Sequence, residues 1–170
     1  MPSETNDEDR ALIARISGQD KAAFELLYRR YYERVNQFLA RMLKEPALVE
    51  EVVDDAMFAV WRTAKTFEGR SRVSTWIMSI AYRQALKALD KSWRRHEVMI
   101  APGALDLPAD EGLAIDPIRH AADSQAHELI GSAMASLSAD HQAVLELVAM
   151  GHNAAEIGCI LACPAATVRS

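Results

Sequence analysis

The chain lacks most features of secreted, membrane-spanning and disulfide-stabilised proteins. Only two of its 170 residues are cysteine, and aromatic residues make up 6%. No apolar run approaches the roughly 18 residues that a membrane span needs. The first ten residues, MPSETNDEDR, are acidic and contain neither the basic nor the apolar region of a signal peptide. We therefore expect a cytoplasmic protein with no membrane segment, in which Cys159 and Cys163 are reduced thiols.

Motifs for catalysis and for cofactor binding are also missing. The five histidines are scattered without the spacing of a metal or catalytic cluster. His152, Cys159 and Cys163 are close in sequence, but a structural zinc site needs a fourth ligand. There is no glycine-rich phosphate loop and no nucleophile motif. We predict that the protein is not an enzyme and needs no metal or cofactor.

Charge is distributed unevenly along the chain, although the net charge is only -5. Residues 1–61 carry a net charge of -4 and residues 96–170 carry -8, whereas residues 62–95 carry +7. Salt screens charges separated by more than about 10 Å, so an acidic protein can still have a local surface that binds a polyanion. The basic segment is therefore the first candidate for a binding site.

Apolar residues recur at intervals of three and four over most of the chain, which predicts helices. Asp20, Ser138 and Asn153 are expected N-caps, and Ser74 or Thr75 is expected to cap the basic helix. Residues 96–123 are rich in proline and acids and are expected to form a linker. We predict an all-α fold with two small helical domains, 1–95 and 124–170, joined by a flexible acidic linker. The expected helices cover residues 9–17, 20–44, 47–66, 74–95, 124–137, 138–150, 153–161 and 164 onward.

One face of the predicted helix over 74–95, STWIMSIAYRQALKALDKSWRR, is basic. Its cations Arg83, Lys87, Lys91 and Arg94 form a stripe: they lie within about 80° of one another on a helical wheel and span about 17 Å along the helix. Trp76 and Ile80 fall in the same sector, and an aromatic ring beside cations can stack on an unpaired base. A solvated surface is the alternative, but such surfaces usually mix both signs of charge. The predicted nucleic-acid contacts are Arg70, Arg72, Trp76, Arg83, Lys87, Lys91, Arg94 and Arg95.

The last 34 residues, LSADHQAVLELVAMGHNAAEIGCILACPAATVRS, predict a helix-turn-helix. The second helix of this motif enters the major groove of DNA. The residues expected to form the core of this helix-turn-helix are Leu145, Val148, Ile157, Leu161 and Val168. The residues expected to contact DNA are Thr167, Arg169 and Ser170. The pattern also resembles the output domain of many response regulators. The recognition helix ends after about two turns at Ser170, so we expect this domain to be truncated at its C-terminus.

These segments in this order resemble an extracytoplasmic-function sigma factor of the sigma-70 family. ALVEEVVDDAMFAVWRTAKTFEG is similar to the family's helix that binds core RNA polymerase, and RVSTWIMSIAYRQALKAL to its segment for the promoter −10 element. The final 34 residues are similar to its −35 helix-turn-helix. The resemblance covers residues 8–95 and 125–170.

The resemblance implies a mechanism in which several partners are bound at once. Residues 68–95 would hold the melted −10 strand, and residues 124–170 would read the −35 element and meet the β flap of the polymerase. Promoter DNA, core polymerase and an anti-sigma factor are thus the implied partners. The residues implied to dock on the polymerase β′ clamp helices are Glu50, Glu51, Asp54, Asp55 and Phe58.

Two other functions remain open from the sequence. A sigma-like mimic would sequester an anti-sigma factor without binding DNA, but the charge of +7 over residues 62–95 favours a DNA-binding protein. A simple helix-turn-helix repressor would leave the acidic helix around residues 50–58 unexplained.

Overall fold

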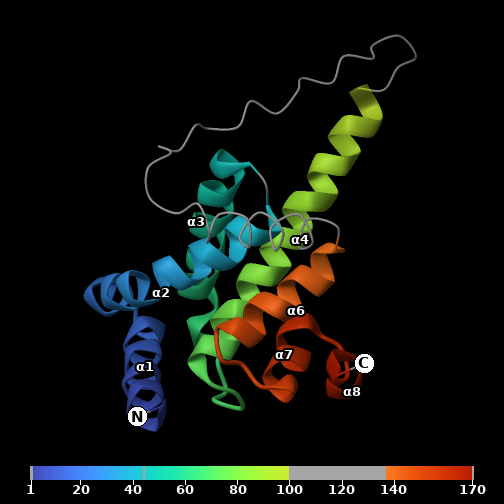
Figure 1. The fold of residues 1–170 in the computed structure, drawn as a ribbon. Helices are drawn as coiled ribbons and strands as arrows, with labels where there is room; N and C mark the ends of the chain where they lie inside the picture. Colours follow the sequence, from blue (N-terminus) through green and yellow to red (C-terminus); the bar gives the residue numbers. More distant parts are fainter. Residues whose placement is uncertain (1, 44, 100–136, 170) are drawn as a thin grey trace, which may run out of the picture.

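The computed structural model describes residues 2–43, 45–99 and 137–169, and all regular secondary structure in these ranges is helical (Figure 1). The predicted all-α class is therefore confirmed. The expected helix over 124–136 and most of the expected linker, from residue 100 onward, lie outside the described residues. The elements are α1 (Pro2–Ser17), α2 (Lys21–Met42), α3 (Pro46–Thr63), the 3-10 turn η1 (Ala64–Thr66), α4 (Val73–Met99), α6 (Ala139–Ala149), α7 (Ala154–Leu161) and α8 (Ala165–Arg169).

Three of the predicted helix caps are present. Asp20 accepts a hydrogen bond from the backbone N–H of Ala23 at 3.1 Å, and the Ser138 hydroxyl accepts one from His141 at 3.5 Å. Asn153 accepts from the N–H groups of its own first turn, and Glu156 accepts from the Asn153 N–H at 3.0 Å. This reciprocal pair is a capping box, which satisfies donors that a helix start leaves unpaired.

The predicted cap of α4 is wrong. The helix begins at Val73, before Ser74 and Thr75, and the Thr75 hydroxyl is buried without a hydrogen-bond partner. The Val73 N–H instead donates to the side chain of Asn6 in α1, at 3.1 Å. The side chain of Asn6, 67 residues away, thus accepts the hydrogen bond that a local cap would otherwise accept. No local sequence pattern indicates this pairing.

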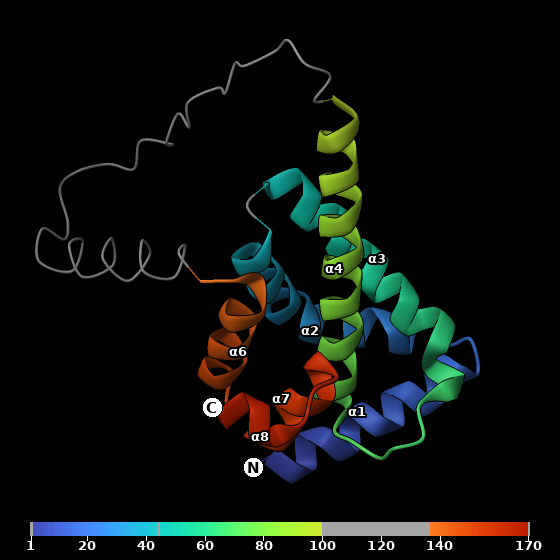
Figure 2. The ribbon, with the colours of Figure 1, turned by 90° about the vertical axis from the view of Figure 1, so that its right-hand side faces the viewer.

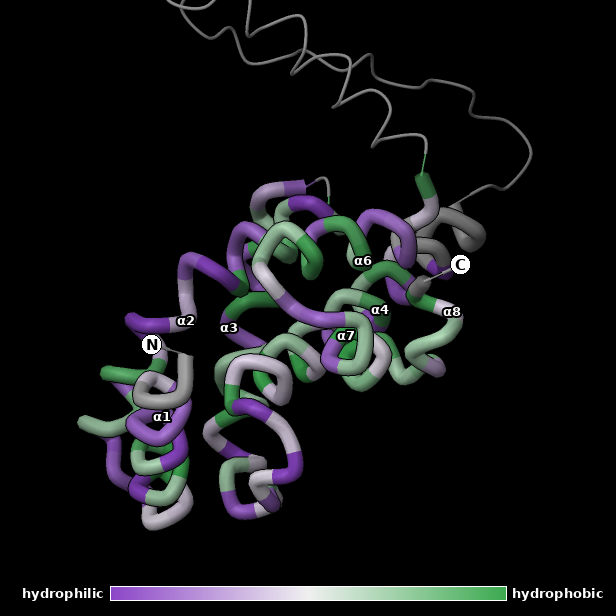
Figure 3. The backbone as a smooth tube through the Cα atoms, turned by 60° about the horizontal axis from the view of Figure 1, so that its bottom comes forward, coloured by the Kyte–Doolittle hydropathy of each residue, from purple (hydrophilic) through white to green (hydrophobic). Residues whose placement is uncertain are grey.

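Helix α4 lies at the centre of the fold. Figure 2 shows α3 on one side of α4 and α7 on the other, and both pack closely against it. The alanines Ala81 and Ala85 are fully buried, and their small side chains let neighbouring helices approach closely. Hydrophobic and hydrophilic residues are interspersed along the long N-terminal helices, as expected when each buries one face (Figure 3).

The C-terminal helices share one hydrophobic core with the N-terminal ones. Ala143, Leu147, Ile157 and Ile160 are buried in the same cluster as the core residues of α1 to α4. The sequence-predicted face of α6 is wrong, because Leu145 and Val148 are 44% and 55% exposed. Ala143 and Leu147, four residues apart, point inward instead, since α6 must face both α2 and α7.

Close packing at the end of α7 depends on Gly158. A Cβ atom there would lie 2.7 Å from the carbonyl oxygen of Cys163, closer than side-chain atoms can approach backbone. Ala162 then ends α7 in the left-handed conformation, with φ of 55°, and turns the chain toward α8. The tight turn of the predicted helix-turn-helix is therefore present.

A buried carboxylate joins α1 to α2. Asp9 is 2% exposed and accepts hydrogen bonds from the Tyr31 hydroxyl and from the Arg30 guanidinium, the latter at 2.5 Å. Burial and the bond to Asp9 raise the pKa of Tyr31 well above its usual value, so the phenol stays a donor. Arg30 also reaches the exposed Glu8 at 3.2 Å.

Replacing Asp9 with Asn should destabilise the protein by about 2–3 kcal/mol, because the bonds from Arg30 and Tyr31 lose their charged acceptor. Urea denaturation at pH 7 measures the effect. Glu8→Gln is the matched control, since it removes the exposed ion pair to the same arginine and should cost less than about 1 kcal/mol. Equal losses in the two variants would contradict the role of the buried carboxylate.

Candidate nucleic-acid interface

The acidic face of α3 is exposed as the sequence predicted. All five of its candidate residues are open to solvent: Glu50, Glu51, Asp54, Asp55 and Phe58. Phe58 is 58% exposed, and the Arg62 guanidinium carbon lies 5.8 Å from the centre of its ring. A large apolar side chain among carboxylates is characteristic of a protein-binding surface.

The basic stripe of α4 is also on the surface. Arg83, Lys87, Lys91 and Arg94 are all exposed. Arg83 donates to the backbone carbonyl of Ser79 at 2.9 Å, and Arg94 pairs with Asp90 at 2.9 Å. Arg95 lies within α4, but its side chain is outside the described part of the structure. The helical-wheel prediction of a stripe is thus correct in its geometry.

Two cations of the stripe share a groove with two of the acids. Lys87 and Lys91 line a cavity of about 180 Å³ between α3 and α4, together with Glu51 and Asp55. Neither lysine forms an ion pair with any residue in 2–43, 45–99 or 137–169. The lysines are therefore held near carboxylates while their ammonium groups remain available to other anions.

The apolar residues predicted beside the stripe are less accessible than the cations. Ile80 is only 6% exposed, so its predicted place on the open face is wrong. Trp76 is half-buried, and its ring centre lies 5.1 Å from that of Phe67. The reason is that α4 is packed on more than one side, which leaves a narrower open sector than a wheel suggests.

The loop between η1 and α4 carries two more candidate cations and is held by α1. Arg70 pairs with Glu68 at 2.6 Å on the surface. Gly69 adopts a left-handed φ of 70°, and its carbonyl accepts a hydrogen bond from Arg10 at 2.9 Å. With Asn6 bound to Val73, α1 fixes both sides of this loop. Sequence reasoning missed Asn6 and Arg10, because both partners are distant in the chain.

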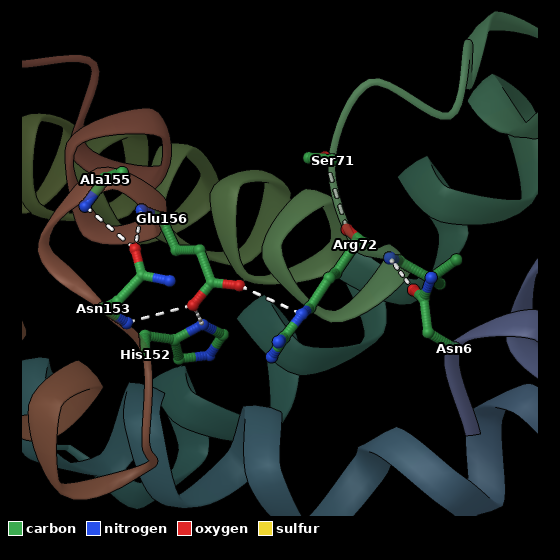
Figure 4. A network of polar contacts seen from close by, with 8 residues as sticks. Asn6, Ser71, Arg72, His152, Asn153, Ala155 and Glu156 are labelled. Atoms are coloured by element: carbon green, nitrogen blue, oxygen red, sulfur yellow. Dashed lines mark hydrogen bonds and ion pairs between the residues drawn. The ribbon is translucent and has the colours of Figure 1, made fainter. Parts of the chain in front are cut away.

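Arg72 points toward the C-terminal helices. Its Nε lies 3.2 Å from a carboxylate oxygen of Glu156, whose other oxygen accepts from the Asn153 N–H (Figure 4). The same oxygen lies 3.7 Å from Nδ1 of His152. The Glu156 carboxylate therefore completes the capping box of α7 and is also the ion partner of Arg72, a candidate nucleic-acid contact.

One of the candidate −35 residues, Thr167, is near α4. Thr167 in α8 is exposed and lines a cavity of about 270 Å³ whose other walls include Tyr82 of α4. The Tyr82 hydroxyl donates to Asp140 of α6 at 2.6 Å, and burial and this bond raise the pKa of Tyr82 well above its usual value. Arg169 belongs to α8, but its side chain is not described, and Ser170 lies outside the described residues.

The two cysteines do not form a disulfide bond. Cys159 is exposed and Cys163 half-buried, and both are free thiols. Residues 2–43, 45–99 and 137–169 hold no group of three or more side chains able to bind a metal ion. None of the helices in these ranges is long and apolar enough to cross a membrane.

Part of the chain matches a known protein family. Residues 27–95, which include α3, the loop and the start and basic stripe of α4, match sigma-70 region 2. The chain therefore contains a sigma-70 region 2. The curated relatives to which it is similar include extracytoplasmic-function sigma factors.

Relatives of similar length extend the match over nearly the whole chain. The ECF RNA polymerase sigma-E factor of Haemophilus influenzae is 29% identical over 167 residues, 95% of this chain and 88% of the relative. The RNA polymerase sigma-H factor of Pseudomonas aeruginosa is 26% identical over 98% of this chain and 89% of its own. Similarity thus includes the C-terminal helices, which lie outside the region 2 match.

Solved structures share the fold. CnrH, in complex with the cytosolic domain of CnrY, superposes with a TM-score of 0.66 at 18% identity, covering 96% of this chain and 88% of CnrH. RpoE of Bartonella quintana, in complex with the anti-sigma factor NepR, gives a TM-score of 0.65 at 22% identity, covering 86% and 87%. These likenesses support the all-helical architecture.

His152 gives a pH-dependent prediction. Burial lowers the pKa of His152 below its usual 6.5, and the nearby charges of Arg34 and Arg72 also lower it, while Glu156 opposes them. His152 therefore becomes protonated near pH 6.5 in the unfolded chain but only at a lower pH in the folded protein. The free energy of unfolding should fall as the pH drops from 7.5 to 5.5.

His152→Gln should remove this contribution. Urea unfolding of both proteins at pH 7.5 and 5.5 measures the difference, and the variant should lose less stability on acidification. An equal loss in both proteins would show that His152 is not the group responsible.

Proposed function

We propose that this protein is a sigma factor that directs RNA polymerase to specific promoters. In this proposal the acidic face of α3 binds the β′ clamp helices of core polymerase. The basic stripe of α4 and the loop before it hold the non-template strand of the −10 element. The C-terminal helix-turn-helix reads the −35 element and meets the β flap.

The observation that carries the proposal is the arrangement of α3 and α4. These helices pack tightly against each other within the sigma-70 region 2 match, and each presents an exposed charged face of opposite sign. Carboxylates around Phe58 suit a protein partner, whereas aligned cations suit the phosphates of a strand. A factor that links polymerase to DNA needs both faces on one rigid support.

Regulation by an anti-sigma factor is part of the proposal. The solved structure of RpoE of Bartonella quintana is a complex with an anti-sigma factor. This chain has the same fold and presents exposed apolar side chains such as Phe58, which a protein inhibitor can cover.

Run-off transcription with purified core polymerase on genomic fragments tests the function. The wild-type chain should yield discrete transcripts. Replacing Arg83, Lys87 and Lys91 together with Ala should abolish them while leaving polymerase binding nearly intact, because only phosphate contacts are lost. The salt dependence of binding to a single-stranded oligonucleotide should also weaken, by about 2 in logarithmic slope for three lost contacts.

A matched control replaces three exposed cations outside the stripe with Ala: Lys21, Arg29 and Lys65. This variant has the same net charge as the stripe variant and should transcribe like the wild type. Full transcription from the stripe variant would refute the strand-binding role. A wild-type chain that binds polymerase but never yields a transcript would refute the initiation function.

Phe58→Ala should weaken binding to core polymerase at least tenfold, because exposed aromatic anchors carry much of an interface's binding energy. Stability should change little, since the ring is 58% exposed. Leu26→Ala is the control, because Leu26 is similarly exposed, at 54%, but belongs to a different helix, α2. Fluorescence anisotropy with labelled protein measures both affinities, and equal affinity for the wild type and Phe58→Ala would contradict the docking surface.

A further inference from the structure

A polar cavity of about 220 Å³ lies where α1, α2, the start of α4 and the turn between α6 and α7 meet. Its walls include two arginines, Arg34 of α2 and Arg72 of the loop before α4, and one histidine, His152 of the turn. Two residues with hydroxyl groups, Thr5 and Ser74, also line it. Four separate segments of the chain thus bring hydrogen-bond donors to one small space.

Arg34 is the cation of this cavity that lacks a counter-ion. Its side chain is exposed and forms no ion pair with any residue that the structure describes. Burial lowers the pKa of His152, Glu156 opposes this, and the charges of Arg34 and Arg72 lower the pKa further. The charge of Arg34 therefore acts on a neutral histidine in the same cavity, where an anion would be attracted.

Arg72 has a partner but can accept a second one. Its Nε lies 3.2 Å from a carboxylate oxygen of Glu156, and its side chain is 49% exposed. Figure 4 shows Arg72 and His152 both directed toward that carboxylate. A guanidinium has five N–H donors, so one contact at Nε leaves others for a ligand. Glu156 balances the charge of Arg72 without using all of its donors.

The carboxylate that lines the cavity is neutralised from the other side. Asp9 is 2% exposed and accepts hydrogen bonds from Arg30, at 2.5 Å, and from Tyr31. Arg30 also reaches Glu8, but that acid is 65% exposed and is screened by solvent. Asp9 and Arg30 thus cancel each other, and the charge of Arg34 remains in excess.

The number and kind of donors favour a phosphate group over a carboxylate. Two guanidinium groups and two hydroxyl groups exceed what the two oxygens of a carboxylate can accept. A phosphate group offers at least three oxygens and carries a charge of about −1.5 to −2 at pH 7, and the planar fork of arginine matches its geometry. A cavity of about 220 Å³ is smaller than the roughly 300–1,000 Å³ of most ligand pockets, so the ligand must be small.

We propose that the cavity lined by Arg34, Arg72 and His152 binds the phosphate group of a small ligand, which is either inorganic phosphate or a small phosphate monoester. The phosphate oxygens accept hydrogen bonds from the two guanidinium groups and from the hydroxyl groups of Thr5 and Ser74. Its negative charge favours the protonated form of His152, so the bound ligand raises the pKa of that histidine. This site goes beyond the proposed function, since it needs neither polymerase nor promoter DNA.

Nuclear magnetic resonance of the full chain tests the site, with inorganic phosphate as the probe and sodium chloride holding the ionic strength constant. The imidazole signal of His152, assigned by its loss in His152→Gln, should shift with phosphate at pH 7 until it saturates. The signals of the other four histidines should not follow the same curve. A pH titration should give a higher pKa for His152 in saturating phosphate than in chloride.

Arg34→Gln should weaken phosphate binding about tenfold or more, because a charge-assisted hydrogen bond and the excess charge are lost. Arg34 is not among the candidate DNA contacts, so the variant leaves those intact. Arg29→Gln is the matched control on the same helix: it makes the same change at an exposed arginine that pairs with Glu25 at 2.7 Å, and it should bind phosphate like the wild type. Both arginines are exposed, so both variants should fold.

Parallel titrations identify the source of the phosphate group. Glycerol 3-phosphate that binds at least as tightly as inorganic phosphate would indicate a monoester, whereas binding of inorganic phosphate alone would indicate the free ion. Acetate should not produce a saturable shift at the same concentrations.

A shift of His152 that never saturates would overturn the proposed site, and so would equal phosphate affinity in the wild type and Arg34→Gln. A third contrary result is a shift produced only by a single-stranded oligonucleotide without terminal phosphates, because the cavity would then belong to the DNA-binding surface. These measurements use no polymerase, so a failed transcription assay leaves them unaffected.

Discussion

The fold depends on the burial of α4 between several partners. This helix packs against α3 on one side and α7 on the other and also contacts α1 and α2, so its buried residues join the N-terminal and C-terminal parts of the core. Small side chains at Ala81 and Ala85 make the close approach possible. This packing bears on the proposed function, because only the sector of α4 that remains open is available for the proposed contact with DNA. Burial of Ile80 removes it from that sector, in which the cations remain exposed.

Helix α1 determines how the loop before α4 is presented. Asp9 ties α1 to α2 through Arg30 and Tyr31, and from that anchored position Asn6 and Arg10 reach the two ends of the loop. The loop itself has the left-handed Gly69 and little apolar content. Its conformation is therefore fixed by side chains of a distant helix. Helix α1 supports the proposed DNA-binding surface in this way, although none of the candidate DNA contacts lies in α1.

Charge acts in this protein at three separate places. The acids of α3 are exposed, the cations of α4 are exposed, and a second set of acids on α6 and α7 contacts the N-terminal helices. The acidic face of α3 and the basic stripe of α4 are therefore not fully separate surfaces, and two contacts show this. Lys87 and Lys91 share a groove with Glu51 and Asp55, and Arg72 already has a carboxylate partner. Both features place protein carboxylates where phosphates would bind.

Much of the fold could be predicted from the sequence because its determinants are local. Helix periodicity, the caps at Asp20, Ser138 and Asn153, and the angular alignment of Arg83, Lys87, Lys91 and Arg94 all depend on residues a few positions apart. The family resemblance rests on the same local segments, and the match to sigma-70 region 2 confirms it.

Only the tertiary structure decided which face each helix buries and which groups pair over long distances. A wheel shows that α6 has an apolar side, but the positions of α2 and α7 select Ala143 and Leu147 over Leu145 and Val148. Likewise, Val73 bonds Asn6 and Arg72 pairs with Glu156 because packing brings distant segments together. The sequence by itself therefore determined the helices and their charged faces, since these follow from neighbouring residues. The closed arrangement of those faces was decided by the packing of α4, which no local pattern encodes.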